Sequence, residues 1–492
     1  IFFALEAAIM AKALEIFFNI PLFFGYLLSS LVVIPIVING FTYINRLQVW
    51  TQPIWLLLHA LPFIFIVANH SYLFDEWTGY TGKLGGLKGE FDILLFGAAS
   101  AVIFSLSAQI GEQVDFLRFL QPKTQENAKA WWISLLSAGP GWMIVGGIKI
   151  FLGSFLLFVC LRVFVPVEMV TDPSYMYNTA FNFVFASSWV AALVTAIFVI
   201  ISQIKINVTN AYAGSIAWSN FFSRLTHSHP GRVVWLVFNV GIGFLLITLG
   251  AYHALEKILA LYSIIAVAWV GALASDLVIN KPLKLSPKHI EFRRAYLYDI
   301  NPVGVGSVIL AVFAAAVSYA GLFGEIMSAL CSFVALAVSF VSAPIIAFLT
   351  GGKYYIARTP SAKIAKLSEL KCCICEATYE SEDMASCPIY EAPICSLCCS
   401  LDARCHDSCK KNARYVDQIS GFLLTLLPRK LTRHLNPIVA SYIGIQVVVS
   451  AIIASVLGLI YLESITDPDT PKAYLSEMLW DTFFIMLIIS AV

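Results

Sequence analysis

The chain consists mainly of long apolar segments separated by short polar ones. Runs of about 20 apolar residues are the pattern of membrane-spanning helices. Pro21, Pro53 and Pro302 are predicted to lie at helix starts, where a missing backbone N–H costs little. The hydrophobic pattern predicts twelve spans, near residues 1–18, 21–44, 51–69, 92–118, 134–163, 184–209, 233–252, 255–279, 303–322, 326–350, 438–461 and 475–492.

The composition agrees with a protein that is largely dissolved in the lipid bilayer. Of the 492 residues, 59% are hydrophobic and 12% are charged, whereas soluble domains are about 45–50% apolar and about 25% charged. A net charge of +1, without a stretch that combines basic and aromatic residues, argues against nucleic acid as a partner. Because the chain begins at Ile1 and ends inside an apolar run at Val492, we expect it to be a piece of a longer protein.

Basic residues are distributed unevenly between the two sides that these spans define. If the loop after the second span is cytoplasmic, that side holds most of the 31 Lys and Arg residues. Such a bias is what the positive-inside rule describes. It predicts a multi-pass protein whose cytoplasmic parts are residues 41–50, 119–132, 210–232, 280–302 and 351–437.

Polar residues enter the predicted span 92–118. Gln109, Gly111 and Glu112 interrupt its apolar sequence. Broken helices inside a membrane expose backbone groups to a ligand or an ion, and we interpret Gln109 and Glu112 as lining a cavity. The alternative is that these residues form the cytoplasmic end of the span.

Lys205 stands in the predicted span 184–209, where a charge that faces lipid costs several kcal/mol. We interpret its ammonium as facing a cavity, where it takes the place of a transported cation or exchanges a proton. One alternative is a structural ion pair with Glu6, Glu15 or Glu112. Another is a side chain that extends to the cytoplasmic interface.

Four segments resemble the nucleobase–cation symporters of the purine–cytosine permease and hydantoin permease type. They read NGFTYINRLQVWTQP, FDILLFGAASAVIFSLSAQIGEQVDFLRFL, ISQIKINVTNAYAGSIAWSNFF and VGALASDLVINK, and their order and spacing agree with the family over residues 1–350. The resemblance implies an all-α, LeuT-type inverted-repeat helix bundle that lacks the first two family helices. It also implies a small ligand of the nucleobase or hydantoin type. Leu106 lies near a position where a hydantoin-type member stacks an aromatic ring on its substrate.

The resemblance also implies roles for residues of the span 184–209. It places Ser202, Lys205 and Ile206 at sodium-ligating positions of the family. Lysine and isoleucine offer no hydroxyl ligand, which argues against sodium coupling and for an ammonium in the place of the ion. Asn207 and Asn210 lie near a substrate-binding asparagine of the family. Being three residues apart, they share a helix face, and the alternative is that they bond neighbouring helices.

Nine of the eleven cysteines lie in residues 371–410. Two Cys-x-x-Cys pairs about twenty residues apart are a zinc signature, which predicts one structural zinc ion on Cys372, Cys375, Cys395 and Cys398. A second zinc ion is predicted on Cys387, Cys405, Cys409 and either Cys399 or His406. Cytoplasmic thiols stay reduced, which favours metal over disulfides, whereas an inverted topology would favour a disulfide knot. An iron–sulfur cluster is a further alternative.

A permease-like body, a Cys-rich insert and further spans together resemble the input half of certain bacterial hybrid sensor histidine kinases. This implies the bacterial inner membrane, a kinase domain in cis beyond Val492, and a homodimer. The sequence itself contains no catalytic motif, phosphoacceptor histidine or ATP-binding glycine box. The alternative is a plain secondary transporter, coupled to a cation or to protons, with a regulatory zinc segment.

The predicted domain organisation follows from these segments. It comprises a permease-like transmembrane domain, a cytoplasmic linker, a Cys-rich zinc-binding segment, a second cytoplasmic linker and two additional transmembrane helices, at residues 1–350, 351–370, 371–410, 411–437 and 438–492.

Overall fold

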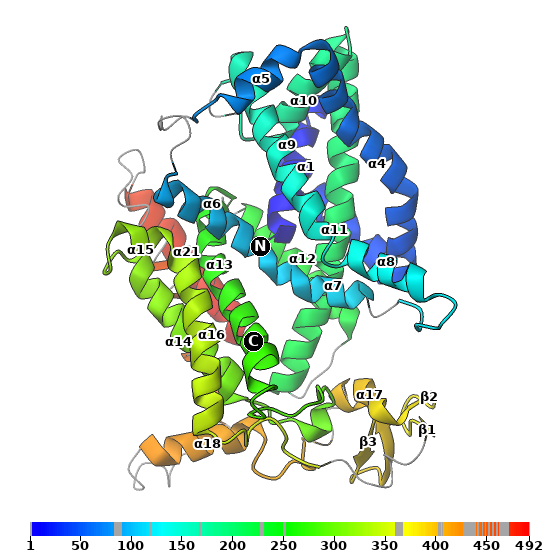
Figure 1. Ribbon diagram of the computed structural model, residues 1–492, viewed down its shortest axis with the longest axis vertical. Coiled ribbons are helices and arrows are strands. Elements are labelled where there is room, and N and C mark those ends of the chain that lie inside the picture. The colour runs from blue at the N-terminus through cyan, green and yellow to red at the C-terminus, as the bar shows by residue number, and fades with distance from the viewer. Residues whose placement is uncertain are drawn as a thin grey trace. The chain divides into compact units, whose positions relative to one another are not determined.

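The computed structural model of the chain divides into two compact units (Figure 1). The first unit comprises Ile1–Asp92, Gln109–Trp218 and Gly231–Leu255, and the second comprises Ile93–Ala108, Ser219–Pro230 and Glu256–Val492. The structure describes residues 2–82, 91–117, 120–166, 169–226, 231–248, 252–359, 368–401, 405, 407–426 and 472–491, with a few more between 439 and 461.

The described part of the first unit is built from helices. Its core gathers buried side chains of several of them, such as Phe3, Val37, Val208 and Val240. The helices are α1 (Phe2–Phe18), α2 (Leu22–Leu31), α3 (Val33–Ile38), α4 (Phe41–Asn69), α5 (Ser71–Thr78), α7 (Gln109–Leu117), α8 (Ala128–Ala138), α9 (Trp142–Arg162), α10 (Pro173–Val184), most of α11 (Ser188–Thr226) and α12 (Arg232–Thr248).

The second unit combines helices with four short strands. Its helical elements are α6 (Ile93–Ser105), the 3₁₀ turn η1 (Leu106–Ala108), the end of α11, α13 (Tyr252–Ser275), the π turn η2 (Asp276–Asn280), the 3₁₀ turn η3 (Arg294–Tyr296), α14 (Pro302–Tyr319), α15 (Glu325–Ala329), α16 (Cys331–Leu349), the 3₁₀ turn η4 (Ser381–Asp383), α17 (Ser396–Leu401), α18 (Tyr415–Leu426) and α21 (Lys472–Ala491). The strands β1 (Glu369–Lys371) and β2 (Thr378–Glu380) form one antiparallel pair, and β3 (Met384–Cys387) and β4 (Ala392–Cys395) form another.

Seven helices of the described chain are long and apolar enough to cross a membrane, as expected for a polytopic all-α membrane protein. They cover Phe41–Asn69, Ile93–Val114, Ala128–Arg162, Ser188–Ser223, Leu259–Asn280, Pro302–Tyr319 and Cys331–Leu349. The predicted spans 21–44 and 233–252 correspond to shorter apolar helices, Leu22–Ile38 and Arg232–Thr248. Most of the predicted span 438–461 lies outside the described residues.

Two of the predicted loops are helical instead. Residues 41–50 belong to α4, which starts after Gly40 (φ +82°) and continues through Pro53 to Asn69. The prediction of a helix start at Pro53 is therefore wrong, whereas Pro302 does occupy the first position of α14, behind the capping residue Asn301. Residues 210–226, predicted as a loop, extend α11. The polar residues that suggested a loop lie within continuous helices.

The predicted interruption of the span 92–118 is present, although not at Gly111. The α-helical hydrogen bonding of α6 gives way to the tighter turn η1 at Leu106–Ala108, and α7 begins at Gln109. Gly111 lies inside α7. A short 3₁₀ stretch of this kind is common where a helix ends or bends.

Helices α14 and α16 pack side by side through small residues (Figure 1). The buried positions of α14 include Ser307, Ala311 and Ala315, and those of α16 include Ser339 and Ala343. Small residues let two membrane helices approach closely, where van der Waals contact holds them together.

The close approach of α14 and α16 predicts the effect of a larger side chain. Ala311→Leu, at a position that is 0% exposed, is expected to lower the free energy of unfolding by about 1–3 kcal/mol because the extra atoms have no space. Thermal unfolding in detergent measures it. The matched control is Phe313→Leu on the same helix, because Phe313 is 70% exposed. Equal effects of the two changes would contradict this packing.

Candidate functional sites

The Cys-rich part of the chain forms a small group of strands and one helix, here called the cysteine module (described residues 368–410; Figure 1). Cys372 and Cys375 lie in the turn between β1 and β2. Cys395 ends β4, and Cys398 lies in α17, which follows directly. The backbone N–H of Cys373 donates to the Pro393 carbonyl at 3.0 Å, which ties the first hairpin to β4.

The four cysteines of the two Cys-x-x-Cys pairs converge. Their sulfur atoms all lie within 4.8 Å of one another. The N–H groups of Cys395 and Ile374 donate to Cys372 Sγ at 3.3 and 3.4 Å, and the N–H of Cys398 donates to Cys395 Sγ at 3.4 Å. Such donors stabilise the thiolate, which is the form that binds a metal. The geometry thus brings together the first predicted set, which could hold a metal ion.

The electrostatics of the four thiols favour a bound cation. Burial raises the pKa of Cys372, but the backbone N–H groups of Cys395, Cys375 and Ile374 outweigh it, and the pKa falls to about 6. Burial, together with its bonds to Cys395 and Cys375, raises the pKa of Cys398. Cys372 therefore ionises more readily than Cys398. A divalent cation supplies the charge that allows all four thiols to ionise.

Four sulfur ligands without a further donor fit a structural metal site. Zinc in such a site is bound tetrahedrally by four protein ligands, with Zn–S distances of about 2.3 Å. Iron–sulfur clusters also use four cysteines, so the donor set alone does not separate the two. Because all four coordination positions would be filled by protein, the ion would stabilise the module rather than bind a substrate.

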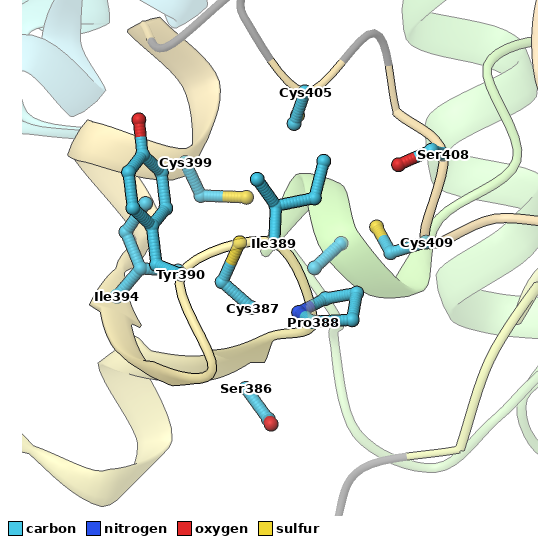
Figure 2. Close-up of a pocket in the computed structure, with 11 residues that line it drawn as sticks. Ser386, Cys387, Pro388, Ile389, Tyr390, Ile394, Cys399, Cys405, Ser408 and Cys409 are labelled. Atoms are coloured by element: carbon cyan, nitrogen blue, oxygen red, sulfur yellow. The ribbon is translucent and has the colours of Figure 1, made fainter.

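Four of the five remaining cysteines of the module gather at a second place. Cys387, Cys405 and Cys409 line one small cavity together with Cys399 (Figure 2). His406, the alternative fourth ligand in the sequence prediction, lies outside the described residues.

Arg294, to which the sequence analysis gave no role, joins the cysteine module to the helices. It is 3% exposed, and its Nε and Nη2 donate to Asp407 Oδ2 at 2.9 and 2.6 Å. Its Nη1 donates to the carbonyls of Ser223 and Ser400, at 3.2 and 3.4 Å. Ser223 is in the last turn of α11, where carbonyls lack an intrahelical partner. One guanidinium thus contacts the end of a membrane helix and two parts of the module.

Asp299 makes a second connection, two residues before the capping residue of α14. Its carboxylate accepts from Lys410 Nζ at 2.6 Å and from the backbone N–H of Tyr415 at 2.9 Å, at the start of α18. Its own N–H donates to the Ala413 carbonyl at 3.0 Å. The adjacent Ile300 exchanges two backbone-to-side-chain bonds with Gln418, at 3.0 and 2.8 Å. Residues 293–301 are thereby fixed on both sides, and we call them the connecting segment.

Lys205 lies near the middle of α11 and is 8% exposed. Its ammonium donates to the Gln48 carbonyl and to Thr51 Oγ1, both at 3.0 Å, and Gln48 Nε2 donates back to the Lys205 carbonyl at 2.8 Å. All three bonds connect α11 with α4. The partners of the ammonium are neutral oxygens, and no carboxylate of the described chain forms an ion pair with it.

Two of the other predicted residues of α11, Ser202 and Asn207, also make contacts between helices. Ser202 Oγ accepts from Trp55 Nε1 of α4 at 3.2 Å. Asn207, which is fully buried, donates to the Phe3 carbonyl of α1 at 3.3 Å, and Asn210 donates to Asn207 Oδ1 at 3.3 Å. The bond of Asn207 agrees with the helix-bonding alternative, whereas that of Asn210 stays within α11. A ligand contact of either residue stays a prediction.

Gln109 and Glu112 are both partly exposed and lie in the first turn of α7. The bonds recorded for Lys205 come from α4, so the structure does not join these two residues to it. Their role as cavity residues stays a prediction.

An aromatic cluster that the sequence analysis missed lies next to Ser202. The rings of Trp55 and His59 stack at 5.0 Å with an interplanar angle of 6°. Tyr177 OH is 2.7 Å from His59 Nδ1, and its ring is 4.4 Å from that of Phe198. His59 Nε2 is buried and, within the described residues, has no hydrogen-bond partner. The i, i+4 spacing of Trp55 and His59 was the available sequence signal.

The sulfur geometry predicts the outcome of removing one ligand. Cys375→Ser is expected to lower the bound metal by about one ion per chain, because a hydroxyl is a poor substitute for a thiolate in a four-sulfur site. Elemental analysis of protein purified under reducing conditions measures this. Cys373→Ser is the control, since Cys373 is exposed and outside the set. If Cys375→Ser retains the full metal content, this site does not bind the ion.

Comparison of the chain with models of protein families, with curated proteins and with solved structures finds no match. Function is therefore inferred from the contacts of Lys205, the aromatic cluster and the cysteine module, together with the resemblance carried by the sequence.

Proposed function

We propose that the chain is a permease-like membrane module that binds a nucleobase-like small molecule and serves as the sensory input of a signalling protein. The family resemblance of residues 1–350 supports the fold and the ligand class. The contact that carries the proposal is that of Lys205 with oxygens of α4. The output would be a kinase domain in cis, in a homodimer, with the cysteine module on the cytoplasmic side of a bacterial inner membrane.

The surroundings of Lys205 support the idea that its ammonium replaces a mobile cation. A backbone carbonyl and a hydroxyl, at 3.0 Å each, are the kind of neutral oxygen ligands that a desolvated cation takes in a membrane protein. An ionisable residue within a membrane span is a functional candidate. A lysine ammonium at this position would hold α4 and α11 together permanently, so the contact would not depend on a bound sodium ion.

The aromatic cluster supports a flat, hydrogen-bonding ligand. Bases stack on aromatic side chains with about 1–3 kcal/mol per base. Trp55 already stacks on His59, and His59 Nε2 is available for a bond. The Nζ atom of Lys149 lies 5.4 Å from the Trp55 ring, which adds positive charge beside the cluster. A ligand that displaced one ring contact would find both a stacking surface and a polar partner.

The sensor role is favoured over plain transport by the attachment of the cysteine module. Helix α11 carries Lys205 and, about five turns later, the Ser223 carbonyl that Arg294 contacts. A ligand can shift the population of two conformations only by its difference in affinity for them. In this proposal, α11 itself would transmit such a shift from Lys205 to Ser223 and thereby to the module.

Replacing Lys205 tests the surrogate-cation proposal. Binding of purines, pyrimidines, hydantoin and allantoin to protein in nanodiscs is expected to be equal in sodium and choline chloride. In Lys205→Ser, sodium is expected to tighten binding by about 5–150-fold, the usual range for coupling between two sites. Lys12→Ser, which removes a lysine paired with Glu15 on α1, is the control. Sodium-dependent binding by the wild type would refute the proposal.

Transport assays distinguish the sensor from the transporter alternative. In proteoliposomes the sensor is expected to bind whichever of these compounds binds in nanodiscs, without concentrating it under a sodium or proton gradient. Gradient-driven uptake that stops in the presence of an ionophore would support a secondary transporter, with the cysteine module as a regulatory or assembly segment.

A further inference from the structure

Four cysteine side chains from separate parts of the module line one cavity (Figure 2). Cys387 ends β3, Cys399 lies on α17, and Cys405 and Cys409 follow that helix. The cavity has about 10 Å³ of free space, which is room for roughly one water-sized sphere. The sulfurs of Cys387 and Cys399 point toward the same space in Figure 2. A single ion is the largest occupant that this space admits.

Adjacent cysteines of α17 serve the two sets separately. Successive residues of an α-helix point about 100° apart, so Cys398 and Cys399 cannot turn toward the same ion. Cys398 joins the set of Cys372, Cys375 and Cys395, whereas Cys399 lines the cavity. Along the chain, Cys387 falls between the two pairs of the first set. The two sets are therefore interleaved, and two ions would cross-link hairpins and helix into one body.

The four thiols at the cavity can act as ligands. None of them, all in the described chain, forms a disulfide. Thiolates from four cysteines are a usual ligand set for one structural zinc ion.

We propose that Cys387, Cys399, Cys405 and Cys409 bind a second thiolate-preferring metal ion, such as zinc, and that this ion holds the module on the connecting segment. The turn between Cys405 and Cys409 contains Asp407, and Lys410 follows it. Both side chains are almost fully buried, at 2% and 1% exposure.

These two residues carry the ion pairs to the connecting segment. Asp407 pairs with Arg294 and Lys410 with Asp299, each at 2.6 Å. Ala295, the residue after Arg294, itself lines the cavity. An ion bound by Cys405 and Cys409 would fix the turn from both ends and thereby position both charges. Metal at this site would control attachment of the module to α14 and α11, whereas metal at the first site would stabilise the hairpins.

The first test counts metal in the full chain, purified in detergent under reducing conditions. The wild type is expected to hold about two zinc ions, and Cys409→Ser about one. Cys373→Ser is the control and keeps both. A wild-type content of only one zinc ion would overturn the second site, and this measurement does not depend on whether a variant folds. The same content in Cys409→Ser would agree with that result.

Hydrogen exchange tests the attachment. The amides of Asp299, Ile300 and Tyr415 donate across the connection. In Cys409→Ser their exchange is expected to rise by about 5–150-fold, the range of ordinary coupling between sites, whereas in Cys375→Ser they stay protected. Asp407→Asn should retain both ions yet release these amides. Unchanged exchange in both Cys409→Ser and Asp407→Asn would overturn the proposed role, even if the ion is bound.

Discussion

The ion pair between Arg294 and Asp407 is the contact on which the arrangement of the cysteine module depends. A guanidinium that is 3% exposed must replace its water by protein oxygens, and Arg294 finds them on Asp407, Ser400 and the end of α11. Removing one partner of a buried pair typically costs about 3–5 kcal/mol, because the other charge is left uncompensated. The module and the end of α11 therefore share this buried polar contact, and a change on either side alters its energy.

The same requirement explains Lys205. Its ammonium has left water and takes a carbonyl and a hydroxyl from α4, while Gln48 returns a bond to its backbone. A cation bound by neutral oxygens is weakly compensated, and such a site responds to added charge or polarity nearby. The stack of Trp55 and His59 lies next to Ser202, one helical turn before Lys205, and in our proposal it would receive a flat ligand. Ligand binding and helix contact would thus be coupled through a fixed charge.

How much of this could be predicted from the sequence depends on the range of the interaction. The spacing of two Cys-x-x-Cys pairs was enough to predict the first metal set, because each turn places two sulfurs close together. Arg294 and Asp407 are 113 residues apart, and no local pattern connects them. Polarity also misled: residues 41–50 were predicted as a cytoplasmic loop, yet they belong to α4, where Gln48 bonds to α11. Sites formed by residues close in the sequence could be predicted, whereas contacts between polar residues far apart in the sequence could not.

The central claim is that thiolate-bound metal holds the cysteine module in place against the membrane helices. Isolated domains of this size usually need disulfides or metal ions for stability. Zinc-edge X-ray absorption of the intact protein tests the claim most directly. The account predicts a shell of four sulfurs at about 2.3 Å around zinc. A shell of nitrogen and oxygen scatterers, or zinc at background level beside an iron–sulfur signal, would contradict it.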